Sequence, residues 1–174
     1  SKRFDIPYLF ISHSMMEMRL MSDQVLIVEN GKINEQMSSD QLALARMGQS
    51  VTGYTNLLKL KDPQIRDELY AYSWGDSELL ISTGNGVAET LFELSSRDII
   101  LLRGFPHAIS ARNLLKCTVE DVFSAGRRLG VKLACGGSEH LVAEVTLPAA
   151  KELMIEKGIE LYAAIKASSF RRIM

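Results

Sequence analysis

The hydrophobic pattern of the first 47 residues combines short apolar runs with one helical segment. The run Tyr8–Ser12 (YLFIS) is almost continuously apolar, as in a short strand buried on both faces. In residues 14–23, apolar side chains recur about three apart, which predicts a helix with one apolar face. Two apolar runs then flank Asn30-Gly31, a pair suited to the type I′ turn of a hairpin. Ser38–Asp40 can cap a short helix that ends near Met47, so residues 1–47 are predicted to be an α/β segment.

The pattern changes after residue 47, where short apolar runs alternate with Gly, Ser, Asp and Asn. The segments ELYAYS and SELLIST flank Trp74–Asp76 and predict a hairpin. Further strands are expected at ETLFEL and DIILL and over residues 114–122, 128–134, 140–145 and 160–168, with one short helix over 148–154. Many short strands at this spacing are typical of a small β-barrel. The predicted fold is mainly β, with an OB-like barrel over residues 48–174 preceded by the α/β segment.

One internal repeat stands out within the barrel segment. TNLLKLKDPQ, from Thr55, resembles RNLLKCTVED, from Arg112, and each leads into strand, turn and strand. Two related half-units packed as one domain would explain the repeat, and a chance match is the alternative. The final residues, FRRIM, are expected to form a solvated or frayed end.

Charge and composition exclude several classes of partner. Lys plus Arg number 20 and Asp plus Glu 21, so a general nucleic-acid or membrane-surface binder is not expected, and any anion site must be local. Tyr70, Tyr72 and Trp74 alternate on one strand face, which favours core packing over base stacking because no basic excess accompanies them. Cys117 and Cys135 lack metal-ligand spacing and are predicted to be small buried hydrophobes. Since neither a signal peptide nor a membrane span is recognisable, a cytoplasmic location is expected, and the start at Ser1 suggests a piece of a longer chain.

His13 directly follows the first predicted strand, where ligands gather in open α/β sheets; a loop histidine bonded to nearby backbone is the alternative. The stretch IPYLFISHSMMEMRLMSDQVLIVENGKI resembles the end of the nucleotide-binding domain of ATP-binding-cassette (ABC) transporters. The resemblance implies that His13 is the switch histidine, which hydrogen-bonds the γ-phosphate of ATP, and that Glu17 is the acidic residue of the next helix. The sequence has no phosphate loop, no Walker B acid and no signature segment. ATP and Mg²⁺ are therefore expected only in a full-length protein, and this chain alone should have no ATPase activity.

Three later segments, SARNLLKCTVEDV, LVAEVTLPAAKEL and KGIELYAAIKASS, resemble in order the motifs of the Mop domain, a small molybdate-binding barrel. The resemblance covers about residues 109–169, within a unit of about 107–174. Mop domains occur in molbindins, in molybdate-responsive regulators and at the C-terminus of the ATPase subunit of molybdate importers. Because a cassette-like segment precedes it here, the resemblance implies the last class.

A tetrahedral dianion such as molybdate or tungstate needs a donor for each oxygen, since its desolvation is costly. Ser110 supplies a hydroxyl, Arg112 and Lys166 supply cations, and Ala167 and Ser168 offer further donors. The alternatives without a bound anion are that Ser110 caps a turn, that Arg112 pairs with a surface acid and that Lys166 is a charge at a strand end.

Thr146 is a predicted N-cap of the short helix in TLPAAKEL, whose first-turn N–H groups around Ala149 would point at a bound anion. The family resemblance implies that these segments meet across a subunit interface, so the site would need a homodimer or a larger assembly. Ala149 departs from the family, which often has a second hydroxyl there. The missing hydroxyl could weaken the oxyanion site or leave the domain as a dimerisation module.

The resemblance further implies that two ATPase subunits drive a membrane permease from the cytoplasmic face of the cell membrane, and that bound oxyanion feeds back on transport. Two other functions stay open. One is a free-standing, molbindin-like oxyanion-binding protein, which would have no use for a switch histidine. The other is the regulatory barrel of a sugar-type importer, in which Ser110, Arg112 and Lys166 would have no oxyanion to bind.

Overall fold

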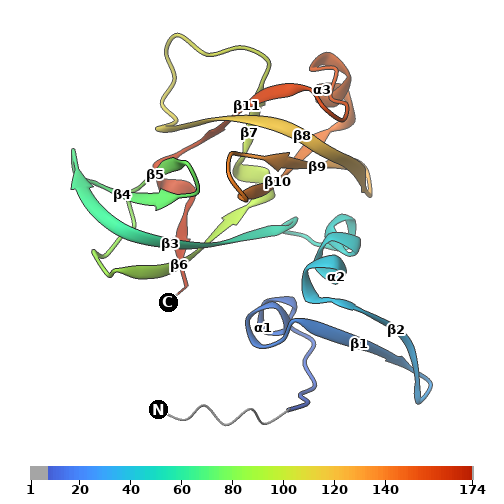
Figure 1. Cartoon of the computed structure of the whole chain (residues 1–174). Coiled ribbons are helices and arrows are strands. Elements are labelled where there is room, and N and C mark those ends of the chain that lie inside the picture. Colours follow the sequence, from blue (N-terminus) through green and yellow to red (C-terminus); the bar gives the residue numbers. More distant parts are fainter. Residues whose placement is uncertain (1–7, 174) are drawn as a thin grey trace. The chain divides into compact units, whose positions relative to one another are not determined.

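The computed structural model describes residues 8–173 (Figure 1). The chain divides into two compact units, unit 1 (residues 1–45) and unit 2 (residues 46–174). Strands dominate the described residues, so the prediction of a mainly β fold is confirmed. In this part of the chain, no helix has the length and apolar character needed to cross a membrane.

The described part of unit 1 consists of two short helices and one hairpin: α1 (Met15–Met21), β1 (Gln24–Glu29), β2 (Lys32–Ser38) and α2 (Ser39–Ala45). Asn30 and Gly31 have φ of 52° and 73°, the positive values that a type I′ turn requires, which confirms the predicted hairpin. Ser14 caps α1 by accepting from the Glu17 N–H, and the Ser38 hydroxyl accepts from the Gln41 N–H at the start of α2.

The strand predicted at Tyr8–Ser12 is wrong: this segment forms no strand. Leu9 and Ile11 are 85% and 92% exposed. A strand needs a neighbour for its backbone N–H and C=O groups, and the described part of unit 1 contains only the β1–β2 sheet, which does not extend to this segment. Among the described residues, the apolar run therefore has no strand with which to pair.

Unit 2 opens with the one-turn 3-10 helix η1 (Met47–Gln49) and contains two antiparallel five-stranded sheets (Figure 1). The first sheet has the order β12-β6-β3-β4-β5: β12 (Arg171–Arg172), β6 (Glu89–Ser95), β3 (Thr55–Arg66), β4 (Leu69–Trp74) and β5 (Ser77–Ile81). The second has the order β10-β9-β8-β11-β7: β10 (His140–Thr146), β9 (Arg128–Ala134), β8 (Asn113–Ala125), β11 (Glu160–Ile165) and β7 (Ile100–Leu102). A single OB-like barrel was predicted, whereas the domain is built from these two half-barrel sheets around a shared core.

The two sheets arise from two equivalent halves that exchange their last strand. The first half runs β3, β4, β5, β6, η2 (Ser96–Asp98) and β7, and the second runs β8, β9, β10, α3 (Leu147–Glu152), β11, η3 (Ala167–Ser169) and β12. Strand β7 pairs with β11 of the second half, and β12 pairs with β6 of the first. The sequence repeat that begins at Thr55 and Arg112 therefore corresponds to a structural repeat.

The C-terminus was predicted to be solvated or frayed; within the described residues it is not frayed, although Arg171 and Arg172 are exposed. Phe170 is fully buried, and Arg171 and Arg172 pair with Glu93 and Phe92 of β6. The pairing with a strand almost eighty residues earlier anchors this end, the red segment that leads to the C label in Figure 1.

Two buried asparagines join the sheets in the same way. Asn56 of β3 donates from Nδ2 to Val142 O (2.9 Å) and Leu94 O (3.2 Å), and its Oδ1 accepts from Val142 N (2.7 Å). Asn113 of β8 does the same with Leu80 O (2.9 Å), Ile165 O (3.3 Å) and Leu80 N (2.7 Å). Each side chain thereby satisfies backbone groups that would otherwise lie unpaired in the interior.

The predicted core residues pack between the sheets. Tyr72 and Trp74 are buried, and the centroid of the Tyr72 ring lies 5.2 Å from that of Phe92. The prediction that this aromatic strand packs into the core is therefore confirmed. Cys117 of β8 and Cys135, the residue after β9, are buried free thiols with their Sγ atoms 3.0 Å apart.

Candidate functional site

Five of the predicted oxyanion residues lie at one end of the second sheet. Ser110 and Arg112 lead into β8, and Lys166, Ala167 and Ser168 follow β11 directly. The pairing of these two strands ends at Asn113↔Ile165, so Arg112 and Lys166 are the residues that flank the last pair. These five residues are called the sheet-end cluster below.

The sheet-end cluster has two cations and no acid of its own. Arg112 and Lys166 are exposed, and within residues 8–173 neither forms an ion pair. Ser110 and Ser168 are also exposed, so their hydroxyls are accessible to a ligand. An anion bound close to the Arg112 and Lys166 side chains would be stabilised by both positive charges.

Thr146 and Ala149 lie elsewhere. Thr146 caps α3 as predicted, and its Oγ1 accepts from the Ala149 N–H at 3.3 Å. Thr146 pairs with Arg128, which in turn pairs with Ala125 at the far end of β8 from Asn113. One chain therefore does not bring this helix to the sheet-end cluster.

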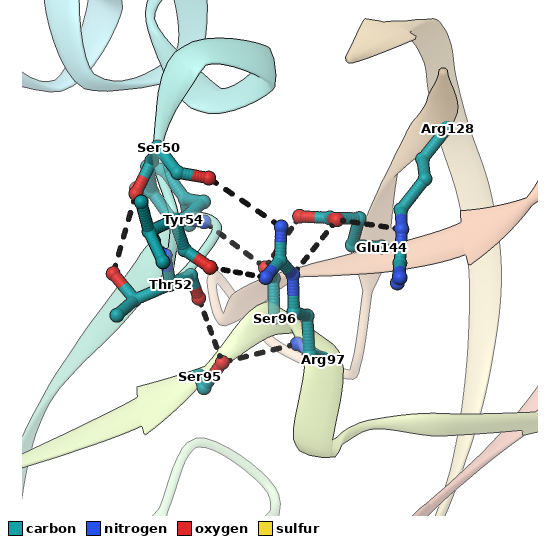
Figure 2. Close-up of polar contacts among 9 residues, drawn as sticks. Ser50, Thr52, Tyr54, Ser95, Ser96, Arg97, Arg128 and Glu144 are labelled. Atoms are coloured by element: carbon teal, nitrogen blue, oxygen red, sulfur yellow. Dashed lines mark hydrogen bonds and ion pairs between the residues drawn. The ribbon is translucent and has the colours of Figure 1, made fainter. Parts of the chain in front are cut away.

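A second polar cluster, around Glu144 of β10, was missed from the sequence (Figure 2). The Glu144 side chain is 2% exposed, and its Oε1 accepts from Arg97 Nε at 2.9 Å and lies 3.5 Å from Arg128 Nε. Its Oε2 lies 3.5 Å from the Ser96 hydroxyl. A buried carboxylate is costly unless it is paired, and these groups provide the pairing. The sequence signal for this cluster was a single acid within the apolar run LVAEV. A buried acid needs a polar partner, but the sequence does not identify that partner.

The Glu144 cluster also fixes the chain before β3. The Arg97 guanidinium donates to the carbonyl of Val51 and, at 3.4 Å, to that of Ser50 (Figure 2). Ser96 N donates to Tyr54 O at 2.8 Å, and the Ser96 hydroxyl accepts from Tyr54 N at 3.1 Å. The 3-10 helix η2 thus holds the segment 50–54 in place.

An open cavity of about 380 Å³ borders this cluster, lined by Thr52, Thr55, Glu93, Ser95, Arg97, Asp98, Ser169 and Arg171. Its lining combines two arginines with two carboxylates, so its charge does not select an anion. No group of His, Cys, Asp and Glu side chains in the described part of the chain could hold a metal ion.

In unit 1, His13 is exposed and directly precedes Ser14, the N-cap of α1. Glu17 lies in the first turn of α1 and accepts from the Ser12 hydroxyl. The hairpin and helix of the cassette-like stretch therefore form, while its first strand does not.

Residues 109–171 match the TOBE domain family. Over 99% of its length, the chain is 29% identical to the molybdenum import ATP-binding protein ModC of Photorhabdus laumondii, and over 95% it is 31% identical to that of Yersinia pseudotuberculosis. The chain spans about half the length of these relatives, 50% and 48%. Among solved structures, the cytoplasmic molybdate-binding protein ModG, crystallised with molybdate bound, matches 67% of this chain and 94% of its own, with a TM-score of 0.57 and 22% identity. That likeness shows a shared fold.

Proposed function

We propose that this chain, which contains a TOBE domain and is homologous to the C-terminal half of the molybdenum import ATP-binding proteins, is the regulatory part of the ATPase subunit of a molybdate or tungstate importer. Unit 2 binds the oxyanion, and unit 1 is the end of the nucleotide-binding domain. A storage barrel is the weaker alternative, because the similarity to the ATP-binding relatives extends over unit 1 as well. A sugar-type importer is weaker too, since these relatives are named for molybdenum import.

The observation that carries the proposal is the pair of exposed cations at the sheet-end cluster. Arg112 and Lys166 flank the last β8–β11 pair without an ion-pair partner among the described residues, and each has an exposed serine, Ser110 or Ser168, two residues away in the sequence. Charge-assisted hydrogen bonds from both cations would offset the desolvation of a dianion. Molybdate and tungstate have the same shape and charge, so the cluster accepts either.

A second chain completes the ligand set in this proposal. Thr146 and Ala149 lie at the far end of β8 from the sheet-end cluster, so they reach an oxyanion only from another copy. A two-fold homodimer would form two such sites, each with the cluster of one chain and α3 of its partner. Because Ala149 has no hydroxyl, Thr146 is the helix-side donor.

The proposed role of unit 1 rests on its exposed apolar surface. Helix α1 buries none of its residues, and Met21, Val28 and Ile33 are more than half exposed. A helix and a hairpin with this much apolar surface need a larger domain to pack on, as the end of a nucleotide-binding domain would. His13 would then contact the γ-phosphate of ATP bound, with Mg²⁺, by the rest of that domain.

The link between the two functions is regulatory. Oxyanion bound between two barrels would favour one arrangement of the ATPase subunits on the permease and so reduce transport when the imported ion accumulates. This works only if the ion binds the inactive arrangement more tightly than the active one.

Calorimetric titration of the chain with molybdate, tungstate and sulfate, with the oligomeric state recorded by light scattering, tests the proposal. We expect molybdate and tungstate to bind, and Arg112→Ala or Lys166→Ala to weaken binding about tenfold or more, because each removes a charge-assisted contact. Lys116→Ala is the matched control: Lys116 is also an exposed cation on β8, but it is paired with Glu160 at 2.8 Å. Absence of binding in a dimeric sample, or an equal loss with Lys116→Ala, would contradict the proposal.

A further inference from the structure

The structural repeat assigns a counterpart to each residue of the sheet-end cluster. The pair Asn56↔Leu94 in the first half occupies the same position as Asn113↔Ile165 in the second, with the same side-chain hydrogen bonds. The exchanged strands agree with this register, because Arg171↔Glu93 then corresponds to Ile100↔Ala164. Counting from these pairs gives the counterparts: Gly53 for Ser110, Thr55 for Arg112, Ser95 for Lys166, Ser96 for Ala167 and Arg97 for Ser168.

In the first half, a carboxylate of the chain itself already lies among these counterparts (Figure 2). Glu144 accepts from Arg97 Nε at 2.9 Å, and its Oε2 lies 3.5 Å from the Ser96 hydroxyl. A Cβ built on Gly53 would lie 2.6 Å from the same Oε2, so this oxygen takes the space that a side chain at residue 53 would need. Three of the five counterparts therefore border one buried anion.

In the second half, no acid lies at the corresponding place. The Val142 N–H donates to Asn56 Oδ1 as the Leu80 N–H donates to Asn113 Oδ1, so Val142 and Leu80 are counterparts. Glu144 is two residues after Val142, and its counterpart two residues after Leu80 is Ser82. Ser82 is exposed and donates from its N–H (3.1 Å) and hydroxyl (3.2 Å) to Ala167 O. The same backbone framework therefore carries a carboxylate in one half and a small hydroxyl in the other.

We propose that Glu144 is a built-in anion, which permanently occupies in the first half the position that an external oxyanion takes beside Ser110 in the second. Each chain then has one exchangeable oxyanion site instead of two. The part of this inference that concerns the second half rests on the proposed function, whereas the role of Glu144 does not. Removing the carboxylate opens a latent site for a small oxyanion between Arg97 and Arg128.

Chemical rescue of Glu144→Ala by acetate tests the role of Glu144. The substitution deletes Cγ and the carboxylate, which are the heavy atoms of acetate. Thermal unfolding is measured at pH 7 in potassium acetate and in potassium chloride of equal ionic strength, for the wild type, Glu144→Ala and Glu144→Gln. In Glu144→Gln, an amide fills the space and leaves no room for the ion.

We expect Glu144→Ala to melt below the wild type in chloride and to gain about 4 °C or more in 0.1 M acetate, because a ligand that binds only the folded state stabilises it. The wild type and Glu144→Gln should gain less than about 1 °C. Equal shifts in all three proteins would overturn the assignment. If Glu144→Ala does not stay folded in chloride, it is refolded from urea in each salt. Recovery in acetate alone supports the assignment, and equal failure in both salts overturns it.

The stoichiometry of molybdate binding tests the second half. One molybdate per wild-type chain supports the inference, and two per chain overturn it. If acetate rescues Glu144→Ala but the wild type binds no molybdate, the role of Glu144 stands and the proposed function alone is contradicted.

Discussion

The two halves of unit 2 have the same framework but differ in electrostatics at the ends of their sheets. Both have a buried asparagine that joins the sheets, and both have an ion pair at the same register position, Lys59–Glu89 and Lys116–Glu160, each at 2.8 Å. At the sheet end, however, the first half has the buried Glu144 carboxylate and the second half has two exposed cations without an acid. The shared features hold the fold together, and the features that differ determine where an anion can bind.

The largest expected effect tests the shared framework. Asn56→Ala and Asn113→Ala should each reduce the free energy of unfolding by about 2–4 kcal/mol, because each leaves a buried backbone N–H and two carbonyls without their side-chain partner. Urea unfolding in oxyanion-free buffer measures both values. A loss below about 1 kcal/mol for either variant would mean that the asparagine is not a structural bridge.

A smaller effect should separate Gly53 from its counterpart Ser110. Gly53 has φ of +78°, and an added Cβ would collide with Glu144 and Ser96, so Gly53→Ala should cost about 2 kcal/mol. Ser110→Ala should change stability by less than about 0.5 kcal/mol, because Ser110 is exposed, and should instead weaken molybdate binding. Equal stability losses would show that the two sheet ends do not differ as described.

The smallest expected effect concerns the two surface ion pairs, whose contributions to stability differ in their dependence on pH. The hydrogen bond and charge of Lys59 lower the pKa of Glu89, so its contribution to stability is present at neutral pH and is lost as the pH falls through the folded-state pKa. The hydrogen bond and charge of Glu160 raise the pKa of Lys116, so its contribution is lost as the pH rises through that pKa. Between pH 3 and pH 11, the stability difference between the wild type and Glu89→Gln should shrink toward the acid end, and that of Lys116→Gln should begin to shrink at the alkaline end. Both should shrink in 1 M salt, and a difference unaffected by salt would rule out an exposed ion pair.

Local patterns predicted much of this structure, and non-local pairing accounts for the errors. The Asn30-Gly31 hairpin, strand β9 and the Thr146 cap each depend on a few neighbouring residues, so the sequence was sufficient to predict them. The run Tyr8–Ser12 has a strand pattern, yet a strand forms only where another one pairs with it.

The same limit applies to the sites. Strand β12 pairs with residues almost eighty positions away, and Glu144 is paired with Arg97, 47 positions away, so neither partner can be read from local pattern. The sheet-end cluster was found through family resemblance. The β8–β11 register places its five residues at the same end of the second sheet, and whether they bind an oxyanion stays a prediction.

The central claim is that the second half holds an exchangeable oxyanion while the first half holds its own carboxylate. Crystals grown with tungstate, whose metal scatters anomalously, would locate the ion directly. We expect one anomalous peak per chain, within hydrogen-bonding reach of Arg112 and Lys166, and none beside Arg97. A peak among Arg97, Arg128 and Ser96, or no peak at the sheet-end cluster, would contradict the claim.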